Sequence, residues 1–108
     1  MTTLSTHVLD TERGAPAAGV RVSLYADDRR VDTAQTGQDG RISDLGRNSL
    51  TSGTYRLVFD VGEYLTTQGR AAPFVQRVSL DFRVEADQGH YHVPLLITPF
   101  ACTTYRGS

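Results

Sequence analysis

The sequence lacks lysine and tryptophan, and it has only one cysteine and one methionine among its 108 residues. Because there is no lysine, no side-chain amine can form a Schiff base with a carbonyl substrate. The single cysteine, Cys102, excludes a disulfide within the chain and is compatible with a reducing compartment. No apolar run reaches the ~18 residues that a membrane-spanning helix needs.

Charge is not concentrated anywhere along the chain. The formal net charge is −1, with acidic and basic residues interspersed, so we expect no nucleic-acid partner. The chain opens without a signal-peptide pattern and closes without Ser-Lys-Leu, so we expect a cytoplasmic location and no membrane partner. The length indicates a single domain over residues 1–108 with one modest core.

Short runs with alternating apolar residues, separated by turn signals, predict an all-β chain. The predicted strands cover Leu4–Asp10, Val20–Tyr25, Arg30–Thr36, Arg41–Leu45, Thr54–Val61, Phe74–Val84, Gly89–Thr98 and Cys102–Arg106. One short helix is predicted over Glu63–Gly69, because Gly69 ends it and Pro73 follows. This spacing of strands is typical of an antiparallel β-sandwich.

The strand over Gly89–Thr98 carries two of the three histidines. Side chains alternate along a strand, so His90 and His92 share one face. The opposite face is apolar and suits the core; it comprises Tyr91, Val93, Leu95 and Ile97. By itself, an outward His-x-His is also compatible with an ordinary solvated face. Pro94 argues against a regular central strand, since it cannot donate a hydrogen bond to a neighbour.

Several strings in the sequence are informative together. They are Ser5-Thr6-His7-Val8-Leu9-Asp10, Asp39-Gly40-Arg41, Gly53-Thr54-Tyr55-Arg56-Leu57, Gly62-Glu63-Tyr64, His90-Tyr91-His92-Val93-Pro94-Leu95-Leu96 and Tyr105-Arg106-Gly107-Ser108. In this order they resemble the 5-hydroxyisourate hydrolases, the enzyme branch of the transthyretin family. The resemblance covers nearly the whole chain. The hormone-carrier branch lacks the histidines and the Tyr-Arg-Gly-Ser ending, so the resemblance favours the hydrolase.

The resemblance implies a transthyretin-like antiparallel β-sandwich of two four-stranded sheets with one short helix, and a homotetramer built around a central channel. It implies hydrolysis of 5-hydroxyisourate to 2-oxo-4-hydroxy-4-carboxy-5-ureidoimidazoline in urate catabolism, with no cofactor and no metal. The implied catalytic residues are His7, Arg41, His92 and Ser108. The implied substrate-binding residues are Tyr105, Arg106 and Gly107.

These residue types suit attack of water on a ring lactam. Histidine transfers protons near neutral pH, and either His7 or His92 could be the general base. Arg41 offers a rigid fork of donors to a carbonyl or an anionic edge. Ser108 is expected to bring a hydroxyl and the terminal carboxylate to the site.

Two other functions remain open at the level of the sequence. The first is a zinc hydrolase in which His7, His90 and His92 converge, because three histidines are a known catalytic zinc set. The second is a non-enzymatic binding protein, because one fold hosts many functions. The sequence also departs from the family's usual pattern at Cys102, where a tyrosine is more common, and this affects the expected packing between chains.

Overall fold

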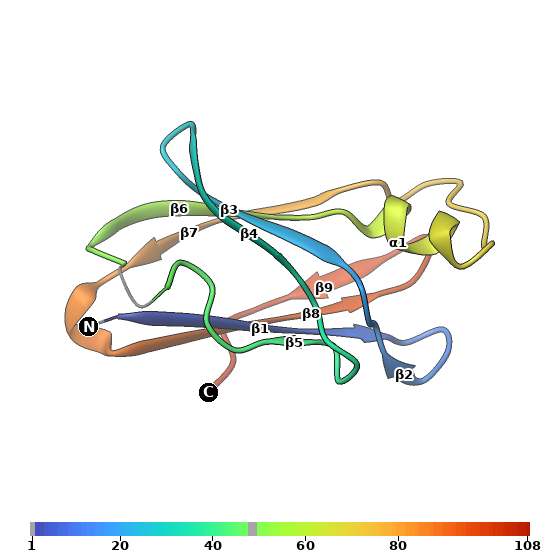
Figure 1. Cartoon of the computed structure of the whole chain (residues 1–108), viewed down its shortest axis with the longest axis horizontal. Helices are drawn as coiled ribbons and strands as arrows, with labels where there is room; N and C mark the ends of the chain where they lie inside the picture. The colour runs from blue at the N-terminus through green and yellow to red at the C-terminus, as the bar shows by residue number, and fades with distance from the viewer. Residues whose placement is uncertain (1, 48–49) are drawn as a thin grey trace.

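The computed structural model describes residues 2–47 and 50–108, which form two β-sheets and a short α-helix (Figure 1). The elements in chain order are β1 (Thr3–Asp10), β2 (Ala15–Pro16), β3 (Arg21–Ala26), β4 (Arg29–Gln35), β5 (Arg41–Ile42), β6 (Gly53–Phe59), α1 (Val61–Thr67), β7 (Val78–Val84), the 3₁₀ helix η1 (Ala86–Gln88), β8 (His90–Ile97) and β9 (Cys102–Thr104). The helices formed by the described residues are too short to cross a membrane.

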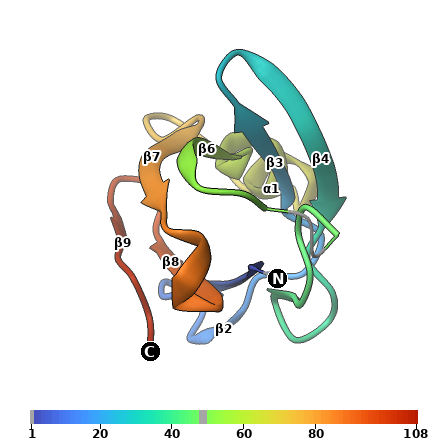
Figure 2. The ribbon, with the colours of Figure 1, turned by 90° about the vertical axis from the view of Figure 1, so that its left-hand side faces the viewer.

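One sheet has the strand order β4-β3-β6-β7, as expected for four strands. The other has the order β2-β1-β8-β9, and β5 also pairs with β1, so this sheet has five strands instead of four. Strand β2 is a two-residue addition to the predicted set. Figure 2 shows the two layers from one end, with β1, β2 and β8 below and β3, β4, β6 and β7 above.

The predicted antiparallel β-sandwich is confirmed, with one exception within it: β1 and β8 run parallel. The chain builds the whole four-stranded sheet between these two strands, and this long connection returns it to β1 in the same direction. The remaining strand pairs are antiparallel.

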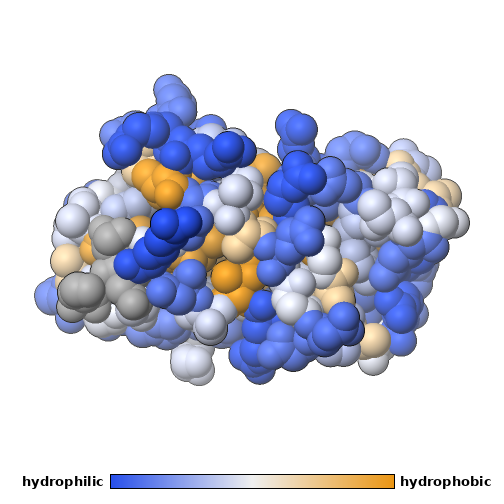
Figure 3. Space-filling model, in the orientation of Figure 1, coloured by the Kyte–Doolittle hydropathy of each residue, from blue (hydrophilic) through white to orange (hydrophobic). Residues whose placement is uncertain are grey.

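The core lies between the two sheets and confirms the predicted alternation. The apolar face of β8 is buried throughout and consists of Tyr91, Val93, Leu95 and Ile97. In β1 the alternate residues Leu4, Thr6 and Val8 are buried, so the intervening residues face outward. Figure 3 shows a largely hydrophilic face in the orientation of Figure 1, with hydrophobic residues visible toward its middle.

Several predicted boundaries differ from the structure. Helix α1 begins at Val61, inside the predicted strand over Thr54–Val61, and ends two residues before Gly69. Because the chain enters this helix directly after β6, residues 74–77 have no strand to pair with, and β7 begins at Val78. Strand β9 ends at Thr104 instead of Arg106.

A buried carboxylate joins the end of β1 to the helix. Asp10 is 1% exposed and accepts hydrogen bonds from the Tyr64 hydroxyl at 2.8 Å and from Nη1 of Arg70 at 2.5 Å. Burial alone would raise the pKa of Asp10, but these hydrogen bonds outweigh it and lower the pKa below its usual value. The ionised carboxylate therefore fixes the strand that carries His7.

Candidate active site

The outer face of the five-stranded sheet gathers the predicted histidines, where β1 and β8 lie side by side (Figure 1). The parallel register pairs Thr3 with His90, Ser5 with His92, and His7 with Pro94. Because paired residues of neighbouring strands direct their side chains to the same face, His7 and His92 lie on one surface. Residues that are 85 positions apart in the sequence are thus brought together.

Arg41 reaches this surface through the predicted Asp39-Gly40 turn. The backbone register pairs Arg41 with His7. Gly40 has a φ of +76°, and a Cβ at this position would collide with the carbonyl oxygen of Val8, so the turn requires glycine. The Val8 amide donates to the Gly40 carbonyl at 2.8 Å, which fastens the turn to β1.

The imidazole of His92 is held from two sides. On the β1 side, Oγ of Ser5 lies 2.8 Å from Nδ1 of His92. On the other side, the Gly107 amide donates to the His92 carbonyl at 2.7 Å, and a Cβ added to Gly107 would lie 2.7 Å from Cδ2 of the ring. Nε2 of His92 has no hydrogen-bond partner among residues 2–47 and 50–108, and it is therefore available to a ligand.

The electrostatics of this surface keep His92 neutral. Burial lowers the pKa of His92 below its usual value of 6.5, and the positive charge of Arg41 and the neighbouring His7 and His90 lower it further. In the described part of the chain, the guanidinium of Arg41 forms no ion pair with a carboxylate. The site thus combines a neutral imidazole with an unpaired cation.

Pro94 is accommodated in the middle of β8, against the expectation that it would disturb a regular strand. Leu95 pairs with Thr104, and His92 pairs with Gly107, so this register places Tyr105 opposite Pro94. Strand β9 has already ended there, and no ladder hydrogen bond requires an amide from residue 94. The Thr104 hydroxyl donates to the Pro94 carbonyl at 2.8 Å instead.

The last four residues do not all reach the histidine face. Gly107 lies against His92, as described above, and Ser108 follows it as an exposed residue. Arg106 stacks on the ring of Tyr91, with Cζ 4.2 Å from the ring centroid, and its Nη2 donates to the His90 carbonyl at 3.3 Å. Tyr105 and Arg106 line a cavity of about 300 Å³ with Tyr91 at the edge of the sandwich. Substrate binding by these two residues stays a prediction.

The three histidines do not form a metal site in the described ranges, where no cluster of three or more His, Cys, Asp or Glu could hold a metal ion. Both ring nitrogens of His90 instead meet hydroxyls: Nδ1 contacts Oγ1 of Thr3, and Nε2 lies 3.0 Å from Oγ of Ser5.

Sequence reasoning missed Ser5 and Thr3. Their positions did contain a signal, because residues 3, 5 and 7 of one strand must share a face with the predicted His7. That signal becomes informative only when the register between β1 and β8 is known.

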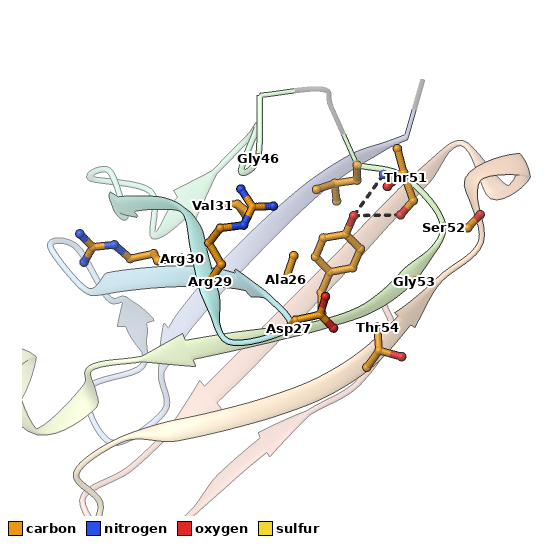
Figure 4. A pocket seen from close by; sticks show the side chains of 12 residues that line it. Ala26, Asp27, Arg29, Arg30, Val31, Gly46, Thr51, Ser52, Gly53 and Thr54 are labelled. Atoms are coloured by element: carbon orange, nitrogen blue, oxygen red, sulfur yellow. Dashed lines mark hydrogen bonds between the residues drawn. The ribbon is translucent and has the colours of Figure 1, made fainter.

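A separate cavity of about 570 Å³ opens between the β3–β4 hairpin and the chain that leads into β6 (Figure 4). Tyr55 lines this cavity, and its hydroxyl donates to the Thr51 carbonyl at 2.9 Å and accepts from the Thr51 amide at 3.1 Å. None of the predicted site residues lines this cavity, so we place the candidate site on the histidine face.

A β-sandwich that carries a neutral imidazole beside an unpaired arginine has the groups that a hydrolytic enzyme needs to activate water and to bind a developing negative charge. The chain belongs to the HIUase/Transthyretin family, which it matches over residues 4–107.

Relatives of known name include both branches of this family. A 5-hydroxyisourate hydrolase of Deinococcus radiodurans is 50% identical over 113 aligned positions, which cover 97% of this chain and 95% of the relative. The solved structure of Klebsiella pneumoniae 5-hydroxyisourate hydrolase has a TM-score of 0.92 and 39% identity, with full coverage of both chains. Sea bream transthyretin in complex with thyroxine has a TM-score of 0.87 and 30% identity, covering 97% of this chain and 94% of that one.

Proposed function

We propose that the chain is a hydrolase that opens the lactam ring of 5-hydroxyisourate, with 2-oxo-4-hydroxy-4-carboxy-5-ureidoimidazoline as the product. The observation that carries this proposal is the surface shared by His7, Arg41 and His92, which combines an imidazole of lowered pKa with an unpaired guanidinium. The 5-hydroxyisourate hydrolase of Deinococcus radiodurans, which is 50% identical to this chain, supports the choice of substrate.

His92 is the general base in this proposal. Its Nδ1 is engaged by Ser5 and its Nε2 is free, so Nε2 can take a proton from the attacking water. The lowered pKa keeps the ring unprotonated at neutral pH, which a base requires. As the water oxygen bonds to the lactam carbon, negative charge develops on the carbonyl oxygen.

Arg41 stabilises this developing oxyanion, because its guanidinium presents several donors and has no competing carboxylate among the described residues. His7 lies beside it and serves as the acid that protonates the leaving ring nitrogen when the C–N bond breaks. Ser108 follows Gly107 and offers its hydroxyl to substrate at the edge of the same surface.

The proposal includes a homotetramer and a cytoplasmic location. The histidine face is the open outer side of a sheet, and a second copy of the chain on this face would enclose the substrate and the attacking water while excluding bulk solvent. The exposed thiol of Cys102 is free, as is usual in a reducing compartment. Sedimentation of the purified protein tests the assembly, and a stable monomer with full activity would contradict it.

The function is tested by adding freshly prepared 5-hydroxyisourate and following the decay of its ultraviolet absorbance against the spontaneous rate. We expect strong acceleration that survives dialysis against a chelator. Activity that is lost to the chelator and restored by zinc would favour the zinc hydrolase instead.

Absence of any acceleration would favour a binding protein. The likeness to sea bream transthyretin gives that alternative its structural basis.

A further inference from the structure

A continuous row of side-chain contacts leads away from Nδ1 of His92. Oγ of Ser5 lies 2.8 Å from this nitrogen and 3.0 Å from Nε2 of His90. Nδ1 of His90 in turn contacts Oγ1 of Thr3, and the same Thr3 oxygen lies 3.5 Å from the carbonyl oxygen of Gly89. His90 and Thr3 have no role in the proposed function, and Ser5 enters it only as the contact of Nδ1.

Each hydroxyl carries a single hydrogen and can also accept. If each hydroxyl donates once and accepts once within the row, the protons have two directions. In the first direction, Nδ1 of His92 donates to Ser5, Ser5 donates to Nε2 of His90, and Nδ1 of His90 donates to Thr3. In the second direction every donor and acceptor is exchanged.

The Gly89 carbonyl distinguishes the two directions. A carbonyl oxygen only accepts, so Thr3 must donate to it if that contact is used. Thr3 then accepts from His90, which sets the first direction along the whole row. The second direction sends the Thr3 proton to His90 and leaves the contact with the Gly89 carbonyl without a hydrogen.

We propose that Ser5 is a positioning residue that, oriented by His90, holds His92 as the tautomer with its proton on Nδ1, so that Nε2 is the basic nitrogen. This inference rests on the proposed function, since it explains how His92 is kept ready as a base. Without Ser5, the Nδ1–H tautomer loses its acceptor and the ring loses its support on the β1 side.

The surroundings of His92 are consistent with a tautomer set by Ser5. The titratable or charged groups that act on the ring are His7 from β1, Arg41 from β5 and His90 from β8 itself. None of these three groups is hydrogen-bonded to Nδ1, which is occupied by the Ser5 hydroxyl.

The experiment compares Ser5→Ala with Ser5→Thr. Removal of the hydroxyl in Ser5→Ala should lower kcat by roughly tenfold to a hundredfold, within the range of general base catalysis, with a smaller change in KM. Ser5→Thr keeps a hydroxyl at the same position and should restore most of kcat. Ser79→Ala removes an exposed hydroxyl from the other sheet and should leave kcat unchanged.

A second readout reports the tautomer directly and needs no substrate. In ¹⁵N NMR spectra of the full-length protein at neutral pH, Nδ1 of His92 should be the protonated nitrogen. Ser5→Ala should shift the signals toward a mixture of tautomers. His90→Leu, which removes the acceptor for Ser5, should produce a smaller shift in the same direction.

Two results would overturn the inference: an Nε2–H tautomer in the wild-type protein, or wild-type kcat in Ser5→Ala. Failure of the proposed function is distinguishable, because it would appear as a wild-type protein without activity on 5-hydroxyisourate.

Discussion

The outer faces of the two sheets differ in what surrounds their arginines. On the four-stranded sheet and its adjoining loops, three arginines pair with carboxylates: Arg21 with Glu63 at 3.1 Å, Arg56 with Asp81 at 2.8 Å, and Arg77 with Asp60 at 2.9 Å. Arg29 and Arg30 of β4 form no ion pair among the described residues, but no histidine lies on that sheet. The five-stranded sheet presents Arg41 beside His7 and His92, and in the described ranges no carboxylate neutralises it.

This difference in surroundings identifies the face of the five-stranded sheet as the candidate active site. Exposed ion pairs are the ordinary covering of a sheet and contribute little to stability. An arginine left without a carboxylate beside a neutral imidazole has its donors available to a substrate. Burial of His92 lowers the pKa of the imidazole, and this cation lowers it further.

The largest effect is expected from replacing the proposed base. His92→Asn should lower kcat by about a thousandfold, or about 4 kcal/mol of transition-state stabilisation, since it removes the group that accepts a proton from water. Circular dichroism should show that the fold is kept. A variant with near wild-type kcat would remove His92 from the mechanism.

The second-largest loss of activity is expected from replacing Arg41. Arg41→Gln should lower kcat/KM by roughly a hundredfold, because the oxyanion loses its charged donors. Arg41→Lys keeps the charge but loses the planar fork, so we expect an intermediate loss in steady-state kinetics. Equal activity of all three proteins would mean that this face does not bind the developing charge.

A moderate effect is expected where the backbone of Gly107 packs against the His92 ring. Gly107→Ala should lower kcat by about tenfold, on the order of 1.4 kcal/mol, because the new Cβ collides with the His92 ring. Deletion of Gly107 and Ser108 should lower kcat at least as much. Gly14→Ala is the control: its Cβ meets no atom within 4 Å, so any cost of its positive φ should affect stability and not kcat.

The pH profile should link Arg41 to His92. Since the pKa of His92 is lowered, kcat/KM should rise with pH through a value below 6.5, as the imidazolium loses its proton. Arg41→Gln removes a positive charge that disfavours the imidazolium, so the rising limb should move to higher pH. An unmoved limb would show that the two groups are not coupled.

The smallest effect is expected on the other face. Arg56→Gln breaks an exposed ion pair with Asp81 in the four-stranded sheet, and kcat should stay within about twofold of wild type. The same assay that detects the loss in Arg41→Gln provides the measurement. A large loss here would abolish the distinction between the two faces.

Local patterns in the sequence determined much of the architecture. Alternation correctly separated the buried face of β8, with Tyr91 and Val93, from the face of His90 and His92. The Asp39-Gly40 pair correctly marked the turn that carries Arg41, because its geometry needs a glycine with positive φ. Strand alternation and turn geometry depend on a few consecutive residues, so they can be predicted from the sequence alone.

Only the tertiary structure decided how distant segments meet. Nothing local indicates that β1 pairs with β8 in parallel, that Ser5 contacts His92, or that Arg106 turns onto Tyr91 instead of the histidine face. The register between two strands is set by the packing of both buried faces against the opposite sheet, and a shift of one residue would send every outward side chain into the core. That packing involves the whole chain at once, and therefore it decides which hydroxyl orients the proposed base.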